Sequence, residues 1–201
     1  MARVRDAFCS YCGTKFAEPL VYPRTCAACG VQIWANPIPV AVALVPVEVD
    51  GGGVSPAGSA AERRGGSIAG RIGLLVIRRA IPPGIGKLAL VGGFVEAHES
   101  WQHGMARELL EETSVAIAAP QFAPLWFASS EPKPDRVLLF GVAPPVRELP
   151  TFEPDDEVSE RGLVFGPDGL DEVFAFSLHA EAARRFFAAR QITGAHAFVA
   201  R

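Results

Sequence analysis

Apolar residues in this chain gather into short continuous runs, separated by stretches rich in glycine, proline and charged residues. Apolar runs of roughly four to eight residues between turn residues are typical of buried β-strands. On this basis the sequence predicts strands at residues 40–45, 72–77, 87–91, 122–128, 137–142 and 163–165. Two further segments, residues 101–113 and 177–190, repeat their apolar residues at helical spacing and are predicted to be helices.

Both predicted helices have one side suited to packing. Ser100 is the expected N-cap of the first helix and Ser177 that of the second. The packing side of the first helix is expected to consist of Ala106, Leu109, Leu110 and Thr113. That of the second helix is expected to consist of Leu178, Ala182, Phe186 and Ala189.

The other side of the first helix carries three glutamates, Glu108, Glu111 and Glu112, within an arc of roughly 100°. Carboxylates held this close repel one another unless a cation lies among them, and their hard oxygen atoms suit Mg²⁺ or Mn²⁺. A solvated helix face is the alternative for three glutamates taken alone. The glycine pair Gly92–Gly93 stands just before this helix, at the end of a predicted strand.

The glycine turn and the helix together resemble the Nudix box, whose family pattern is G-x5-E-x7-R-E-U-x-E-E-x-G-U, with U a bulky aliphatic residue. Gly93, Glu99 and the run Arg-Glu-Leu-Leu-Glu-Glu-Thr-Ser-Val at residues 107–115 stand at the matching positions. The one departure is Ser114, where the family has glycine. A helix C-cap expected in the left-handed conformation therefore carries a side chain here.

The resemblance implies an α/β fold, the Nudix-type α/β/α sandwich with a mixed sheet, over about residues 37–201. It implies that Glu108, Glu111 and Glu112 coordinate Mg²⁺ or Mn²⁺, with the carbonyl of Gly92 as a further ligand. Arg107 and Glu99 would form an ion pair that orients the helix and the glycine loop.

The chemistry that the resemblance implies is hydrolysis of a nucleoside diphosphate linked to another moiety, X. Water attacks one phosphorus of the pyrophosphate, and the metal neutralises charge and lowers the pKa of that water. The general base differs between branches of the family, so Glu112, Glu111 and a downstream acid all stay open. In similar proteins a glutamate just before the last strand reaches the metal centre, and Glu157 or Glu160 in the acidic run 153–160 fits that place. A solvated loop is the alternative for this acidic run.

Substrate phosphate would be contacted near the glycine pair. Gly92 and Gly93 belong to the catalytic loop, and the basic residues Arg78, Arg79 and Lys87 precede it in sequence. Exposed loop charges without a ligand are the alternative for each of these three side chains.

Four cysteines stand near the N-terminus, in the pairs Cys9-x2-Cys12 and Cys26-x2-Cys29, and a glycine follows each pair. Two such turns can bring four sulfurs together in a tetrahedral Zn²⁺ site, with the glycine adopting a turn conformation that a side chain would hinder. A disulfide and a redox-active pair are the alternatives. We expect residues 1–36 to form a zinc ribbon whose folding depends on the metal.

A zinc ribbon before such a domain resembles the NADH pyrophosphatase branch, which cleaves NAD(H) to nicotinamide mononucleotide and AMP and can remove NAD caps from RNA. The Ser-Gln-Pro-Trp-Pro-Phe-Pro stretch of that branch is absent, since residues 124–132 read Pro-Leu-Trp-Phe-Ala-Ser-Ser-Glu-Pro. Pro132 lies near the position of a proline that the family associates with ADP-ribose specificity. The X moiety therefore stays open between a dinucleotide and a nucleotide sugar.

Net charge and composition indicate which kinds of binding partner and cellular location to expect. A net charge of -3 over 201 residues gives no general attraction to RNA, so binding of an RNA cap finds no support there. The sequence contains no apolar run long enough to cross a membrane and no signal-peptide pattern at its start, so a cytoplasmic location is expected. Residues 50–71, rich in glycine, alanine and serine, are expected to be a flexible insertion.

Two further hypotheses accompany the hydrolase. The domain could instead bind a nucleotide or RNA as a sensor with little hydrolytic activity, although all the carboxylates of the box are present. The ribbon could also serve as a dimerisation module, giving a homodimer whose interface includes Tyr22 or Trp34.

Overall fold

The computed structural model describes residues 7–17, 21–49 and 71–201. The chain forms two compact units, Met1–Pro37 and Ile38–Arg201. The expected insertion at residues 50–71 lies outside the described residues, except for Arg71, which begins a strand.

The N-terminal unit is built from two small hairpin-like turns. One contains the bridge between Phe8 and Lys15, and the other pairs β1 (Arg24–Thr25) with β2 (Gln32–Ile33) in antiparallel fashion. Gly13 and Gly30, which follow the two cysteine pairs, both have φ of +74°, the left-handed region that favours glycine. Each turn therefore has the glycine conformation that the sequence predicts.

The larger unit contains two sheets. The first has the order β11 (Ala197–Ala200), β10 (Val158–Phe165), β5 (Arg71–Arg79) and β4 (Pro46–Val49), with β6 (Leu88–Ala89) also paired to β5. The second has the order β7 (Val91–Phe94), β3 (Ile38–Leu44), β9 (Arg136–Val142) and β8 (Ala123–Ser129). The β3–β9 pair is parallel and the other pairs are antiparallel, so the expected mixed arrangement is confirmed.

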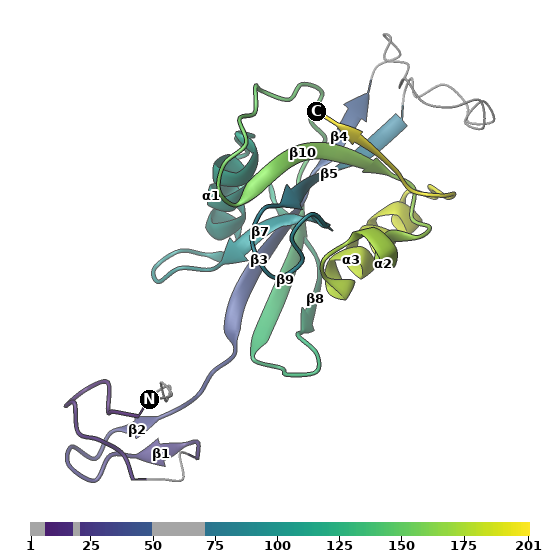
Figure 1. Ribbon diagram of the computed structural model, residues 1–201. Helices are drawn as coiled ribbons and strands as arrows, with labels where there is room; N and C mark the ends of the chain where they lie inside the picture. The colour runs from purple at the N-terminus through teal and green to yellow at the C-terminus, as the bar shows by residue number, and fades with distance from the viewer. Residues whose placement is uncertain (1–6, 18–20, 50–70) are drawn as a thin grey trace. The chain divides into compact units, whose positions relative to one another are not determined.

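Helices cover both faces of the strands. Figure 1 shows α1 (Trp101–Thr113) on one side and α3 (Ser177–Ala189), with the short α2 (Leu170–Val173), on the other. Alternate strand residues supply the two cores: Leu75 packs on the α1 side with Met105, and Leu74 packs on the α3 side with Phe186. A 3₁₀ turn, η1 (Ala119–Gln121), follows α1. The α/β/α sandwich is thereby confirmed.

Several local expectations need correction. Ser177 does not cap α3: it is the first helical residue, and the N-cap position is occupied by Phe176 without a side-chain bond. Of the expected packing residues of α3, Ala182 and Phe186 are fully buried and Leu178 is partly buried, whereas Ala189 in the last turn is exposed. The buried face also includes Ala183 and Phe187, so it is wider than predicted.

The helix α1 is also rotated from its expected orientation. Met105 is fully buried and Leu110 is 52% exposed, because the sheet-facing stripe is centred on Met105 and Leu109. The predicted strand 87–91 is interrupted at Leu90, where the chain leaves one sheet for the other, and β11 and α2 were not predicted. No helix within the described residues has the length and apolar character needed to span a membrane.

Candidate active site

Gly92 and Gly93 do not form the turn that the sequence suggested, but lie within β7, where they pair with Val42 and Ala41 of β3. A short loop after Phe94 leads to α1. The Ser100 hydroxyl caps α1 by accepting a hydrogen bond from the His103 N–H at 3.3 Å, as predicted. At the other end, Ser114 has φ of +61°, and its N–H donates to the Leu110 carbonyl at 2.9 Å. The left-handed C-cap is therefore present, with a serine in place of the glycine that this conformation favours.

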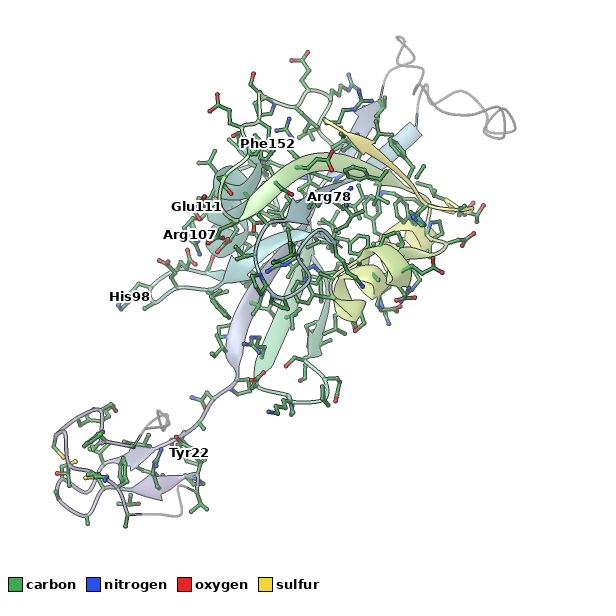
Figure 2. All side chains as sticks on the ribbon, viewed as in Figure 1. Tyr22, Arg78, His98, Arg107, Glu111 and Phe152 are labelled. Carbon is green, nitrogen blue, oxygen red and sulfur yellow. The ribbon has the colours of Figure 1, made fainter. Side chains whose placement is uncertain are left out.

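Arg107 is the centre of a dense set of contacts on α1. Its guanidinium donates to Glu99 at 2.9 Å and to the Phe94 carbonyl at 3.0 Å. The same group donates to Glu108 at 2.8 Å and to Glu111 at 3.1 Å, and Figure 2 shows Arg107 and Glu111 side by side. The bond to Glu99 raises the pKa of Arg107 and lowers the pKa of Glu99, so both groups stay charged. Arg107 thus joins the loop before α1 to two of the three box glutamates.

Glu112 lies on the sheet side of α1, where its carboxylate accepts a hydrogen bond from the Gly92 N–H at 3.0 Å. Burial raises the pKa of Glu112 to about 8, and the Gly92 N–H only partly opposes this rise. Burial also raises the pKa of Glu108. Both carboxylates are therefore held in a poorly hydrated place, where negative charge lacks full compensation.

The structure separates the two downstream acids. Glu157 lies near enough for its negative charge to add to the raised pKa of both Glu108 and Glu112. Glu160 forms an ion pair of 2.6 Å with Arg78 instead. The backbone accounts for this difference, because an irregularity between Val158 and Glu160 places Glu160 directly opposite Arg78 in the β10–β5 ladder.

The two arginines before the box mainly hold the turn at residues 81–86. Arg78 donates to the Gly86 carbonyl at 2.8 Å, and Arg79 donates to the carbonyls of Pro83 at 2.8 Å and Pro82 at 3.4 Å. Arg79 also reaches the carboxylate cluster electrostatically, because its positive charge opposes the rise in the Glu112 pKa. The side chain of Lys87 is exposed.

Sequence reasoning missed two buried polar residues near the site. Arg161 donates to the carbonyl of Thr113, the last residue of α1, at 2.6 Å and to the Pro150 carbonyl at 2.7 Å. His179, on α3, accepts a hydrogen bond from the Leu90 N–H at 3.1 Å through Nδ1. Neither residue stands out in the sequence, since Arg161 directly follows Glu160 and His179 lies two residues before Glu181, and a local pattern does not reveal a partner far away in sequence.

Comparison with known proteins agrees with this geometry. A family model described as the NUDIX domain matches residues 63–189, well over half of the chain. The chain belongs to the Nudix family. The prediction that it is a Nudix hydrolase is thereby confirmed.

Solved structures share the Nudix fold. A Nudix hydrolase from Nitrosomonas europaea is 25% identical, with 92% of each chain covered and a TM-score of 0.55. A MutT/nudix family protein from Enterococcus faecalis is 21% identical over 79% of this chain and 64% of its own, with a TM-score of 0.57. The Nudix domain of Shewanella oneidensis NrtR, complexed with ADP ribose, is 17% identical over 77% of this chain and 87% of its own, with a TM-score of 0.54.

The residues of the Nudix box fit a divalent cation with oxygen ligands. The donor set consists of carboxylates, two of which are partly buried with too little compensating charge. Gly93 leaves the space that Glu108 occupies, since a Cβ there would lie 2.1 Å from a Glu108 carboxylate oxygen. Arg107 now compensates the charges of Glu108 and Glu111. A cation bound here would replace Arg107 in that role.

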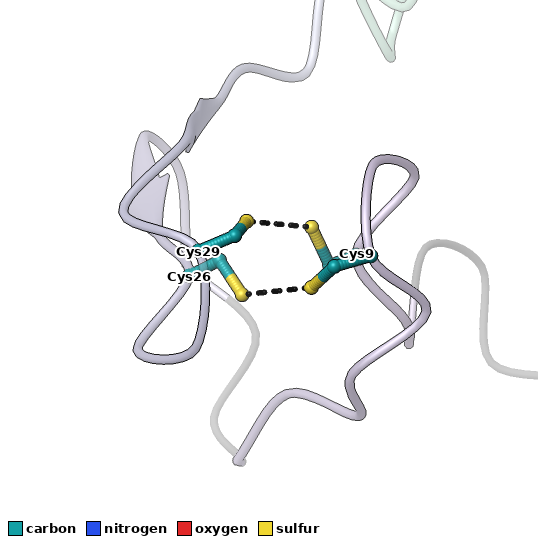
Figure 3. A group of neighbouring side chains, drawn as sticks. Cys9, Cys26 and Cys29 are labelled. Carbon is teal, nitrogen blue, oxygen red and sulfur yellow. Dashed lines mark hydrogen bonds between the residues drawn. The ribbon is translucent and has the colours of Figure 1, made fainter.

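The four cysteines fit a structural zinc ion. Their sulfur atoms all lie within 4.8 Å of one another, with Cys9–Cys29 at 3.8 Å and Cys12–Cys26 at 3.6 Å (Figure 3). A tetrahedron with Zn–S bonds of about 2.3 Å has sulfur–sulfur edges of about 3.8 Å. Hydrogen bonding with the side chain and backbone of Thr14 lowers the pKa of the Cys12 thiol to about 6. For Cys29, a backbone hydrogen bond with Val31 lowers the pKa, but desolvation and the neighbouring thiols outweigh it and raise the pKa to about 12. Without a cation, the four sulfurs therefore do not all ionise together.

Proposed function

We propose that this Nudix hydrolase cleaves the pyrophosphate of a nucleoside diphosphate linked to another moiety, by attack of water on phosphorus in the presence of Mg²⁺ or Mn²⁺. The observation that carries the proposal is that two partly buried box carboxylates lie against β7: Glu112 accepts from the Gly92 N–H, and Glu108 fills the space beside Gly93. A cluster of partly buried carboxylates is suited to binding a cation and, through it, a polyanionic substrate.

Each box residue has a defined place in this proposal. Glu108, Glu111 and Glu112 would hold the divalent cation, together with the carbonyl of Gly92. When bound, the cation would neutralise phosphate charge and lower the pKa of the attacking water. Arg107 keeps its contacts to Glu99 and the Phe94 carbonyl, and these fix the loop between β7 and α1 while the glutamates change partners.

Glu112 and Glu157 are the two candidates for accepting the proton of the attacking water. The Gly92 N–H bonds to one carboxylate oxygen of Glu112, Oε2, and so orients the group. The other oxygen, Oε1, does not take part in that bond. Glu157 is exposed and so open to solvent, while its charge acts on the cluster. Glu160 is not a candidate in this proposal, because Arg78 neutralises it.

The substrate class finds support in the names of structural neighbours. One is the NrtR domain complexed with ADP ribose, and another is a bifunctional NMN adenylyltransferase/ADP ribose pyrophosphatase from Francisella tularensis, complexed with AMP and a manganese ion. A third is an Ap4A hydrolase from C. elegans. ADP-ribose, NADH and dinucleoside polyphosphates are therefore the first substrates to test. We assign Zn²⁺ to Cys9, Cys12, Cys26 and Cys29 as a structural ion.

The test is product release from ADP-ribose, NADH, FAD, dinucleoside polyphosphates and NAD-capped RNA, each with Mg²⁺ or Mn²⁺. Wild type is compared with Glu112→Gln, which should lose about 100-fold or more in kcat. Glu172→Gln is the matched control, since Glu172 is exposed on α2. Binding of one nucleotide without turnover of any would contradict the hydrolase and favour a nucleotide sensor.

A further inference from the structure

Within the described residues, β7 is the edge strand of its sheet, so the outer edge of the segment from Leu88 to Phe94 is bonded by side chains and loops. The N–H of Val95 bonds to the Pro39 carbonyl, which shows that the odd-numbered residues Val91 and Gly93 direct their N–H groups toward β3, while Ala89 pairs with β5. The even-numbered residues face outward. Their partners are the Ala175 N–H for the Leu88 carbonyl, His179 for Leu90, Glu112 for Gly92 and Arg107 for Phe94.

Leu90 stands at a point where strand pairing cannot satisfy its N–H. The chain leaves β5 after Ala89 and joins β3 at Val91, so Leu90 belongs to neither ladder. Leu90 is 1% exposed, which also excludes water as the usual partner. The Nδ1 atom of His179 accepts this N–H at 3.1 Å.

The surroundings of His179 keep its Nδ1 atom unprotonated and therefore able to accept the hydrogen bond from Leu90. It is buried on α3, with its ring against Phe140 and Phe176 at centroid distances of 5.9 and 4.9 Å. Burial lowers the pKa of His179 to about 3, so the ring is neutral throughout the physiological pH range. With Nδ1 accepting from Leu90, the ring proton belongs on Nε2.

We infer that His179 is a positioning residue for strand β7: it fixes Leu90, just before the strand, and thereby holds Gly92 where its N–H meets Glu112. Leu90 and Gly92 are two residues apart on the same edge, so a shift of one displaces the other along the strand. A displacement of about 1 Å in a catalytic group can lower a rate by about 100-fold. The part of this inference that concerns rate rests on the proposed function, while the part that concerns strand geometry does not.

The test compares three variants of the full chain. His179→Leu keeps an apolar side chain but removes the acceptor, and His179→Asn retains an acceptor oxygen close to the Nδ1 position. Phe187→Leu is the control for loss of packing, because Phe187 is buried on the same helix and its side chain does not accept from Leu90. The measurements are amide hydrogen exchange at Leu90 and Gly92 by NMR, thermal unfolding, and kcat and KM on the substrate found in the panel.

We expect His179→Leu to speed exchange at Leu90 by about tenfold or more relative to Phe187→Leu. Its kcat should fall by about tenfold with KM within about twofold, and His179→Asn should recover most of both losses. Equal exchange and equal kcat in His179→Leu and Phe187→Leu would overturn the inference. Faster exchange with unchanged kcat would also overturn the positioning role. If the wild type turns over no substrate, the proposed function fails independently of this inference. Amide exchange at Leu90 and Gly92 then still decides whether His179 fixes the position of β7.

Discussion

The N–H of Gly92 donates to the carboxylate of Glu112 across 3.0 Å, joining β7 to the last turn of α1. One residue of the glycine pair thereby orients a glutamate twenty positions later in the chain. Because the bond lies in a poorly hydrated place, it only partly offsets the penalty for burying the charge of Glu112.

The raised pKa of Glu112 predicts how stability depends on pH without divalent metal. Its folded-state pKa of about 8 lies above the ordinary value of 4.5, so the folded protein binds more protons between these values. The free energy of unfolding should therefore fall as pH rises through this window, by on the order of 2–4 kcal/mol from this group. Urea unfolding at pH 5 and pH 8 measures it.

Glu112→Gln isolates that contribution, since glutamine does not titrate. The variant should lose less stability than the wild type between pH 5 and pH 8, and should be the more stable protein at pH 8 without metal. Identical pH dependence in the two proteins would contradict the raised pKa. Glu172→Gln should follow the wild type at both pH values.

Gly93→Ala should lower kcat by displacing a carboxylate. An added Cβ would lie 2.1 Å from an oxygen of Glu108, so the Glu108 side chain must move away. We expect a loss of about tenfold to 100-fold, with the fold retained by circular dichroism. A double-mutant cycle with Glu108→Gln supplies the control: Gly93→Ala should have little further effect in that background, whereas additive losses would show that Gly93 acts through another group.

Ser114→Gly should stabilise the larger unit. Ser114 has φ of +61°, where a Cβ is unfavourable by about 1 kcal/mol, although glycine also increases the entropy of the unfolded chain. A net gain of about 0.5–1 kcal/mol in the free energy of unfolding is expected from denaturant titration. Ser114→Ala keeps the Cβ and should bring no gain. A gain of equal size in both variants would point to the hydroxyl group and not to the backbone conformation.

Removal of zinc should unfold the N-terminal unit and leave the larger unit folded. The purified chain should contain one zinc ion, measured by atomic emission, and Cys26→Ser should lose it because a three-thiol site binds zinc more weakly. NMR signals of residues 7–37 should then collapse toward random-coil positions, while those of α1 and the sheets persist. Full dispersion of the ribbon signals in zinc-free protein would contradict a metal-dependent fold.

Features that depend on a single helix or turn could be predicted from the sequence. The helix predicted for residues 101–113 has those bounds, with Ser100 as its cap, because the capping residue and the apolar spacing are local properties. The left-handed Ser114 and the two glycines after the cysteine pairs follow from the same local rules. The pattern of the box was likewise sufficient to name the family.

Relationships between distant elements were decided by the tertiary structure. Glu157 and Glu160 are equivalent in the sequence, but the irregular pairing of β10 with β5 sends Glu160 to Arg78 and leaves Glu157 near the box. His179 finds Leu90 only because the chain changes sheets at that residue.

The sequence by itself thus determined the family, the catalytic helix and the cysteine pairs, since their spacing within a turn or helix sets which side chains share a face. Only the tertiary structure decided that Glu160 pairs with Arg78 while Glu157 stays exposed, that Arg78 and Arg79 brace a turn, and what satisfies the Leu90 N–H. The physical reason is that strand register and sheet crossover depend on the packing of the whole core, and a shift of one residue reverses the face on which each side chain lies.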